Sequence, residues 1–98
     1  MSIALTATFE VQADKTAEFE AVVLELAGKV LGGEPGVSMY QLCRSQIEPT
    51  KYRLLEVYDG QETLTAHGQT AWFKELGPKL GACLAAKPVI EKFDFVTG

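Results

Sequence analysis

Apolar and polar residues alternate along the first part of the chain. Over residues 3–11 every second side chain is apolar, and β-branched and aromatic residues are frequent, which predicts a strand. The period then changes to that of a helix with one apolar face, made of Phe19, Val22, Val23, Leu26 and Val30. Gly32-Gly33 ends this predicted helix, and Glu34-Pro35-Gly36 turns the chain.

Five more elements follow in the remaining sequence. They are strands at residues 37–46 and 51–59, a short helix that ends near His67, a helical segment from about Thr70, and a strand at residues 88–96. The order β-α-β-β-α-β predicts an α+β, ferredoxin-like fold, with a four-stranded antiparallel sheet and helices on one face. A chain of 98 residues has material for one core, so we expect a single domain over residues 1–98.

Two features of the second helical segment indicate where the helix begins and where it is interrupted. Thr70 is placed to cap its N-terminus, because a threonine oxygen can accept from the free backbone N–H groups there. Gly77-Pro78 is expected to break or kink the helix, because proline removes a helix hydrogen bond.

The two middle strands carry bulky residues on both faces. Met39 alternates with Tyr40, and Leu55 alternates with Leu54. A sheet face without helices would then expose an apolar area larger than most monomers tolerate. We therefore expect a homodimer in which two copies pack sheet against sheet, so that the pair forms a dimeric α+β barrel.

Composition and charge limit the kinds of partner that this protein is expected to bind. The net charge is −4, and no basic face is available for phosphates, so nucleic acid is not an expected partner. The longest apolar runs are far shorter than the roughly 20 residues of a membrane span, and we identify no signal peptide, so no membrane partner is expected. Two cysteines are too few for a disulfide scaffold, which favours a cytoplasmic protein.

Three segments together resemble one known family. They are Glu34–Arg44, Tyr52–Tyr58 and His67–Phe73. They contain a Pro-Gly turn, a tyrosine in the second strand, a glutamate followed two positions later by an aromatic residue in the third, and a histidine before a Thr-x-x-Phe segment. In this order and spacing, over about residues 3–96, the chain resembles the antibiotic biosynthesis monooxygenase (ABM) domain family.

The resemblance implies a dimeric α+β barrel with a small-molecule cavity in each subunit. Some members of the family oxygenate quinols or polycyclic phenols with O2 and without metal or flavin, so no cofactor is expected. Haem-degrading relatives and anthrone oxygenases use an asparagine beside a tryptophan, and this chain contains no asparagine. That absence disfavours both activities and leaves the quinol-monooxygenase-like group.

Two residues are the candidate catalytic groups. Oxygenation without a cofactor needs a base that removes a phenolic proton inside an apolar pocket. His67 is the only histidine, and imidazole is the side chain whose ordinary pKa lies near neutrality, so it is the first candidate; the alternative is a structural histidine at a helix end. Glu56 lies in an apolar strand and could orient His67 or act as a base with a raised pKa. Its alternative role is an ion pair with Arg44 or Arg53.

Four further residues are candidates for substrate binding. Arg44 could hold an anionic group, or it could tie strands or subunits together. Tyr40, Tyr58 and Trp72 could line an aromatic slot, or they could belong to the core. Of the adjacent aromatics, we assign Trp72 to the cavity and Phe73 to the core. The sequence leaves open whether His67, Trp72 and Glu56 converge on one cavity, because the hairpin register decides which face each strand residue occupies.

Three functions remain open from the sequence. The first is a cofactor-independent monooxygenase that oxidises a quinol or a related phenolic molecule. The second is a dimer that binds a small aromatic ligand without turning it over. The third is haem binding with His67 as the ligand.

Overall fold

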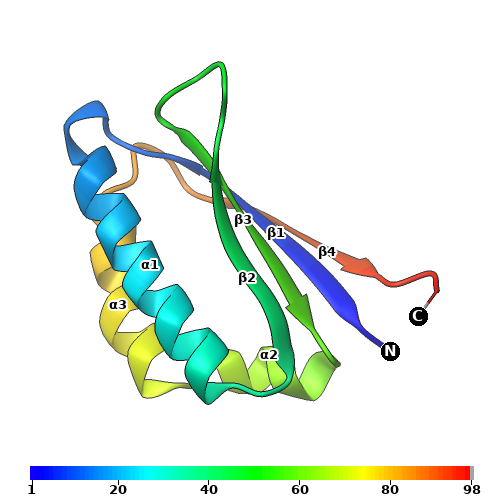
Figure 1. Cartoon of the computed structure of the whole chain (residues 1–98). Coiled ribbons are helices and arrows are strands. Elements are labelled where there is room, and N and C mark those ends of the chain that lie inside the picture. Colours follow the sequence, from blue (N-terminus) through cyan, green and yellow to red (C-terminus); the bar gives the residue numbers. More distant parts are fainter. Residues whose placement is uncertain (98) are drawn as a thin grey trace.

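The sequence-predicted β-α-β-β-α-β order is confirmed by a computed structural model, which describes residues 1–97 (Figure 1). A short 3-10 turn precedes the first helix, and the second helical region consists of two separate helices. The elements are β1 (Ile3–Glu10), η1 (Ala13–Lys15), α1 (Thr16–Gly33), β2 (Val37–Arg44), β3 (Lys51–Tyr58), α2 (Gln61–His67), α3 (Ala71–Gly81) and β4 (Val89–Asp94).

The four strands form one antiparallel sheet in the order β2-β3-β1-β4. Helices α1 and α3 lie together on one face of the sheet, and α2 crosses at the end where β2 begins (Figure 1). This arrangement is the ferredoxin-like α+β fold. Among residues 1–97, no helix covers the other face of the sheet.

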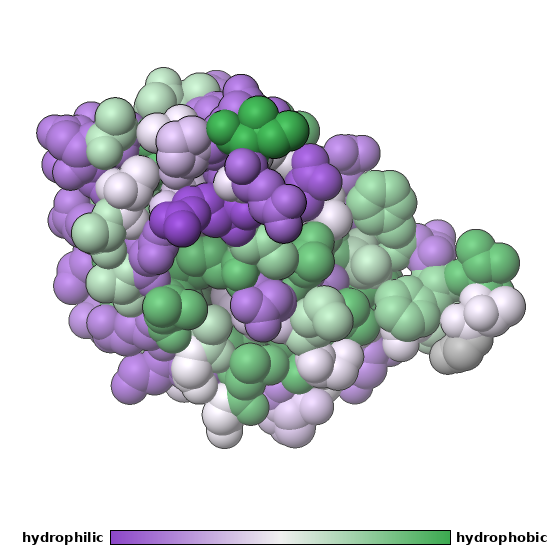
Figure 2. All heavy atoms as spheres, turned by 45° about the horizontal axis from the view of Figure 1, so that its top comes forward, coloured by the Kyte–Doolittle hydropathy of each residue, from purple (hydrophilic) through white to green (hydrophobic). Residues whose placement is uncertain are grey.

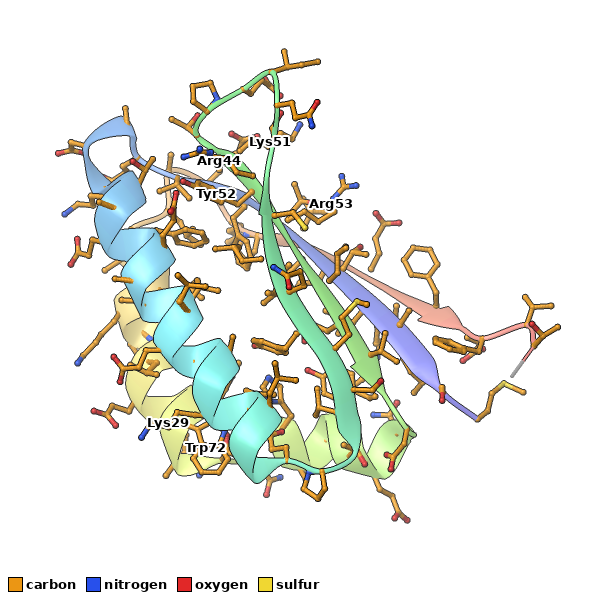
Figure 3. All side chains as sticks on the ribbon, viewed as in Figure 1. Lys29, Arg44, Lys51, Tyr52, Arg53 and Trp72 are labelled. Atoms are coloured by element: carbon orange, nitrogen blue, oxygen red, sulfur yellow. The ribbon has the colours of Figure 1, made fainter. Side chains whose placement is uncertain are left out.

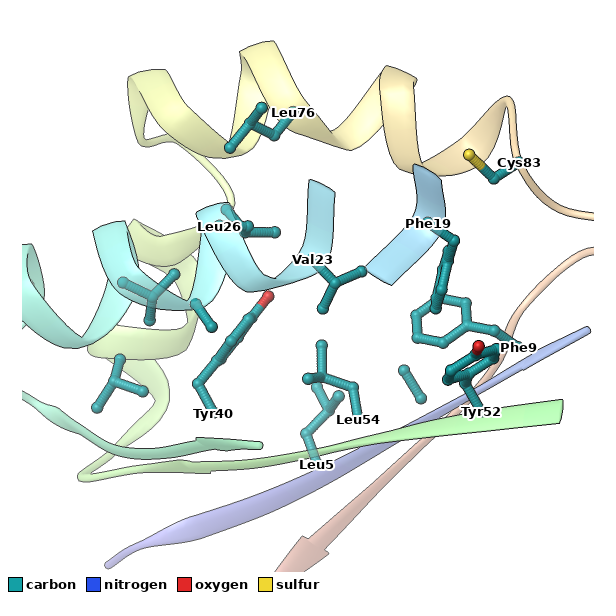
Figure 4. Packing of buried hydrophobic residues seen from close by; sticks show 14 of the residues in the cluster. Leu5, Phe9, Phe19, Val23, Leu26, Tyr40, Tyr52, Leu54, Leu76 and Cys83 are labelled. Atoms are coloured by element: carbon teal, nitrogen blue, oxygen red, sulfur yellow. The ribbon is translucent and has the colours of Figure 1, made fainter. Parts of the chain in front are cut away.

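The core lies between the sheet and the two long helices (Figure 4). The predicted apolar stripe of α1 is buried there; only Val22 of its five members remains partly exposed. The sheet side contributes large rings, because Phe9 and Tyr52 both pack against Phe19 of α1, with ring centroids 5.3 and 4.9 Å apart. Burial of each such side chain stabilises the fold by roughly 1.5–3 kcal/mol.

Helix α3 begins at the predicted cap and continues through the proline that was expected to break or kink it. Thr70 is the N-cap, and its hydroxyl oxygen accepts from the backbone N–H of Phe73 at 3.3 Å. Gly77-Pro78 does not break the helix, because α3 runs through Pro78 to Gly81. Proline removes one hydrogen bond, to the carbonyl of Lys74. Both residues are on the exposed side of the helix, where water can satisfy that carbonyl.

Candidate functional site

A cavity of about 300 Å³ lies between the helix-covered face of the sheet and helices α2 and α3. Its wall is mainly aliphatic and aromatic, and the polar side chains are confined to three residues. The lining residues are Leu5, Ala7, Phe9, Leu26, Tyr40, Leu54, Glu56, Leu64, His67, Gly68, Phe73, Gly77, Leu80, Pro88 and Ile90. A cavity of this size and character fits a small organic ligand.

The β2–β3 register decides which strand residues face the cavity. Tyr40 and Glu56 are direct partners across the two strands, so their side chains project from the same face. An irregularity between Val37 and Met39 brings Val37 and Tyr40 to the helix-covered side although they are three residues apart. Figure 4 shows the hydroxyl of Tyr40 pointing from the strand toward the helices.

His67 is the last residue of α2 and is 5% exposed. Its Nε2 lies 3.3 Å from the hydroxyl oxygen of Tyr40, and its Nδ1 lies 3.0 Å from Oε1 of Glu34. Aromatic rings surround the imidazole, with centroid distances of 5.5 Å to Tyr58 and 4.9 Å to Phe73. The imidazole is therefore held on both nitrogens at the wall of an apolar cavity. A haem iron would have to displace one of these partners.

Glu56 is the second ionisable group of the cavity wall and is 6% exposed. Burial raises its pKa from 4.5 to about 7, and the nearby charge of Glu34 adds to the shift. The hydroxyl of Tyr58 donates to Oε1 of Glu56 and opposes part of that rise. A carboxyl with a pKa of about 7 can take up or release a proton near neutral pH.

The alternative ion pairs of Glu56 are contradicted. Arg44 instead lies 3.3 Å from Glu20 of α1, and Arg53 donates through Nε to the hydroxyl of Thr8. Arg44 is absent from the cavity wall and borders a separate open hollow beside the β2–β3 hairpin. Figure 3 shows Arg44 and Trp72 near opposite ends of α1.

Two of the expected binding aromatics lie behind the cavity wall. Tyr58 is fully buried and reaches the site through Glu56 and His67. Trp72 and Phe73 exchange the places expected of them, because Phe73 lines the cavity and Trp72 lies outside it. The indole covers Gly33, where a Cβ would lie 2.8 Å from the ring, so the absence of a side chain on Gly33 makes room for it.

Glu34 is the site residue that the sequence interpretation missed. It follows α1 in the turn that leads to β2, and it is only 9% exposed. Its carboxylate accepts from Nε1 of Trp72 at 2.7 Å and contacts Nδ1 of His67. Nothing in its local sequence, a turn before Pro35-Gly36, distinguishes it from a solvent-exposed turn residue.

The described residues form neither a metal-binding cluster nor a membrane-spanning helix. Within residues 1–97, no group of three or more histidine, cysteine, aspartate and glutamate side chains is arranged to hold a metal ion. Over the same residues, no helix has the length and apolar character needed to cross a membrane.

Fold and site define an α+β ferredoxin-like protein with a ligand-sized cavity between the sheet and the helices. The sequence over residues 2–78 matches the family model of the antibiotic biosynthesis monooxygenases, ABM. The chain therefore belongs to the ABM family, as its motifs predicted, and this membership supports a monooxygenase-like function.

Solved structures agree with this assignment. A Caulobacter crescentus CB15 protein described as a "putative antibiotic biosynthesis monooxygenase" is 46% identical, with a TM-score of 0.95, over 98% of this chain and 91% of the other. A conserved protein from Methanosarcina mazei Go1 is 26% identical, with a TM-score of 0.91, over 95% and 91% of the two chains. A comparison with curated proteins gives no match.

Proposed function

We propose that this protein is a cofactor-independent monooxygenase that oxidises a quinol or a related phenolic molecule with O2. The observation that carries the proposal is the grouping of His67, Glu56 and the Tyr40 hydroxyl on the wall of one mostly apolar cavity. Family membership supports the oxygenase chemistry, and the cavity chemistry supports the substrate class.

The proposed reaction begins with proton removal. His67 Nε2 takes the proton of a substrate hydroxyl, and the phenolate that results is electron-rich enough to give one electron to O2. The substrate radical and superoxide then combine through a new carbon–oxygen bond to form a peroxide. Cleavage of the O–O bond, with return of the proton, releases water and leaves a hydroxylated quinone. One quinol and one O2 thus give one hydroxyquinone and one water.

The cavity provides two conditions for this reaction. Its apolar wall excludes water, which would otherwise solvate the phenolate and react with the intermediates. The Tyr40 hydroxyl and the protonated form of Glu56 can donate hydrogen bonds to the oxygen atoms that become negative. The wall contains no lysine or arginine side chain, so the proposed substrate enters uncharged and loses its proton inside.

Oxygen consumption tests the proposal. Purified protein is mixed with a panel of hydroquinones, naphthoquinols and catechols, and O2 uptake is compared with the uncatalysed oxidation of each compound. We expect uptake above background, with one O2 consumed for each hydroxyquinone formed. Saturable binding of the same compounds with no uptake above background would instead favour the non-catalytic binding protein.

Gly77 offers a test of where the substrate binds. It lines the cavity from α3, and apart from the adjacent residues and the backbone of its own helix, a Cβ there would meet nothing within 4 Å. The variant Gly77→Leu is expected to fill part of the cavity and raise KM for a naphthoquinol about tenfold. Gly28→Leu is the control, because Gly28 lies on the exposed face of α1, also with open space around its Cβ. Both changes favour the helix by roughly 0.8 kcal/mol. An unchanged KM in Gly77→Leu would place the substrate elsewhere.

We also propose that two copies pair through the helix-free face of the sheet. Strand register aligns Met39, Val57, Ala4 and Phe93 in one apolar row across all four strands. Met39 is 44% and Phe93 48% exposed, which is a large apolar surface to leave in water. Figure 2 shows hydrophobic atoms spread over a broad area of the face that it draws, next to hydrophilic ones.

Sedimentation of a charged variant tests this pairing. Val57→Lys places a cation in the middle of the apolar row, and two-fold symmetry brings in a second one from the other copy. We expect dimer dissociation at least tenfold stronger than in the wild type. Ala21→Lys, on the exposed outer side of α1, is the control and should stay dimeric. A wild-type protein that sediments as a monomer at micromolar concentration would refute the pairing.

A further inference from the structure

We infer that Glu34 is a positioning residue, which fixes the tautomer of His67 so that the ring nitrogen facing the cavity carries no proton. The inference deepens the proposed function, because a base must present a free lone pair to the substrate. Glu34 itself lies outside the cavity wall and acts only through the imidazole.

The two hydrogen-bond donors around Glu34 determine the proton positions. The indole of Trp72 can only donate, and its Nε1 lies 2.7 Å from Oε2. The Nδ1 of His67 lies 3.0 Å from Oε1 and 3.2 Å from Oε2, so it faces both oxygens. An ionised carboxylate can only accept hydrogen bonds. The hydrogen atom between the two groups therefore belongs on Nδ1, and the carboxylate accepts from both rings.

This assignment also determines the protonation of Nε2, the nitrogen on the opposite edge of the imidazole. A neutral imidazole carries one N–H group, so a proton on Nδ1 leaves Nε2 with a lone pair. That nitrogen accepts from the hydroxyl of Tyr40 across 3.3 Å. A substrate hydroxyl that takes the place of the Tyr40 hydroxyl meets the same lone pair. The carboxylate also stabilises the positive charge that the ring gains when it takes the proton.

The backbone holds the Glu34 carboxylate in this position. Its N–H donates to the carbonyl of Val30, and its own carbonyl accepts from Val37, both at 2.9 Å. These bonds fix the residue between the end of α1 and the start of β2. Trp72 packs over the neighbouring Gly33 and covers much of the Glu34 carboxylate. Both Glu34 and Trp72 border a hollow on the outer surface. The geometry is thus set before any substrate binds.

Nitrogen NMR of the imidazole tests the inference without any substrate. The chain has one histidine and one tryptophan, so each ring gives a single set of signals in 15N-labelled protein. At about pH 9, where an ordinary imidazole is neutral, we expect the wild type to show the Nδ1–H tautomer. In Glu34→Gln, the amide oxygen accepts from Trp72 and the amide N–H donates to Nδ1. We therefore expect that variant to change to mainly the Nε2–H tautomer.

Two other variants separate positioning from general damage. Trp72→Phe removes one donor but keeps the carboxylate, so the Nδ1–H tautomer should persist. Glu20→Gln alters a carboxylate that serves Tyr52 and Arg44 far from the cavity, and its imidazole spectrum should equal that of the wild type. An Nε2–H tautomer in the wild type, or an unchanged tautomer in Glu34→Gln, would overturn the inference.

The rate of quinol oxidation is a second measurement, and it depends on the proposed function. If a quinol is oxidised, Glu34→Gln should lower kcat about tenfold or more, with KM little changed, because the carboxylate does not touch the substrate. A tautomer change without any quinol oxidation in the wild type would support the positioning role and refute the oxygenase. Oxidation that is unaffected by the tautomer change would refute His67 as the base.

Discussion

Replacement of His67 by alanine is expected to lower kcat/KM for quinol oxidation by about 10²–10⁴-fold, the usual contribution of a positioned general base. The imidazole is the group at the cavity wall whose nitrogen lies within 3.3 Å of a hydroxyl that faces the cavity. Without it, the substrate would have to lose its proton to water or to Glu56. The measurement is the initial rate of O2 uptake at saturating and at low quinol concentration.

The variant needs a control for folding, because His67 is buried against three aromatic rings. Circular dichroism and the thermal midpoint report the fold. Free imidazole added to His67→Ala should restore part of the rate, since the deleted side chain leaves a space of the same shape. A folded variant with the wild-type rate would remove His67 from the mechanism. Full activity in a His67→Ala/Glu56→Gln variant would exclude both groups.

The fold was predictable because its periodicities are strong and local. The stripe of α1 repeats over five apolar positions and is buried as expected. Residues 3–11 alternate with a period of two, whereas the later strands are recognised by β-branched and aromatic residues bounded by turn signals. Pro78 does not break α3, because a single missing hydrogen bond is tolerated on an exposed helix face, where water replaces it. Propensity rules describe a local cost, and the packing of the rest of α3 exceeds that cost.

The candidate site was predictable only in part, because it depends on contacts between distant residues. The chemistry of His67 and Glu56 singled them out as candidates, but their separation in space depends on a strand register that the sequence leaves open. Glu34 has no signal of its own, because its burial results from Trp72, 38 residues away, lying over it. Adjacent aromatics are equally ambiguous until the rotation of α3 is known.

Substitution of Glu56 by glutamine is expected to make the protein more stable at high pH and to leave its stability at low pH nearly unchanged. In the folded protein the pKa of Glu56 is about 7, whereas its ordinary value is 4.5. Between these values the folded state holds a proton that the unfolded chain has lost. The free energy of unfolding therefore falls as the pH rises through this window.

The size of the stability difference follows from the shift in the pKa of Glu56. A shift of about 2.5 pKa units corresponds to roughly 3 kcal/mol, which is the full difference expected at pH 8 and above. Desolvation is the largest cause of the shift, and the charge of Glu34 adds to it. Glutamine has the same shape as the protonated carboxyl, and its oxygen can still accept from Tyr58, so the site keeps its hydrogen bond. The substitution therefore removes only the buried negative charge.

Denaturant unfolding from pH 4 to pH 9 measures this difference, with the wild type and Glu56→Gln compared at each pH. Because both proteins share every other titrating group, including His67, Tyr40 and Glu34, subtraction isolates the contribution of Glu56. Glu25→Gln, on the exposed side of α1, is the control and should parallel the wild type at all pH values. A wild type as stable as Glu56→Gln at pH 8.5 would mean that the carboxylate is solvated or paired in the folded protein. Glu56 would then be an ordinary acid, ionised throughout the neutral range and unable to donate a hydrogen bond to the substrate.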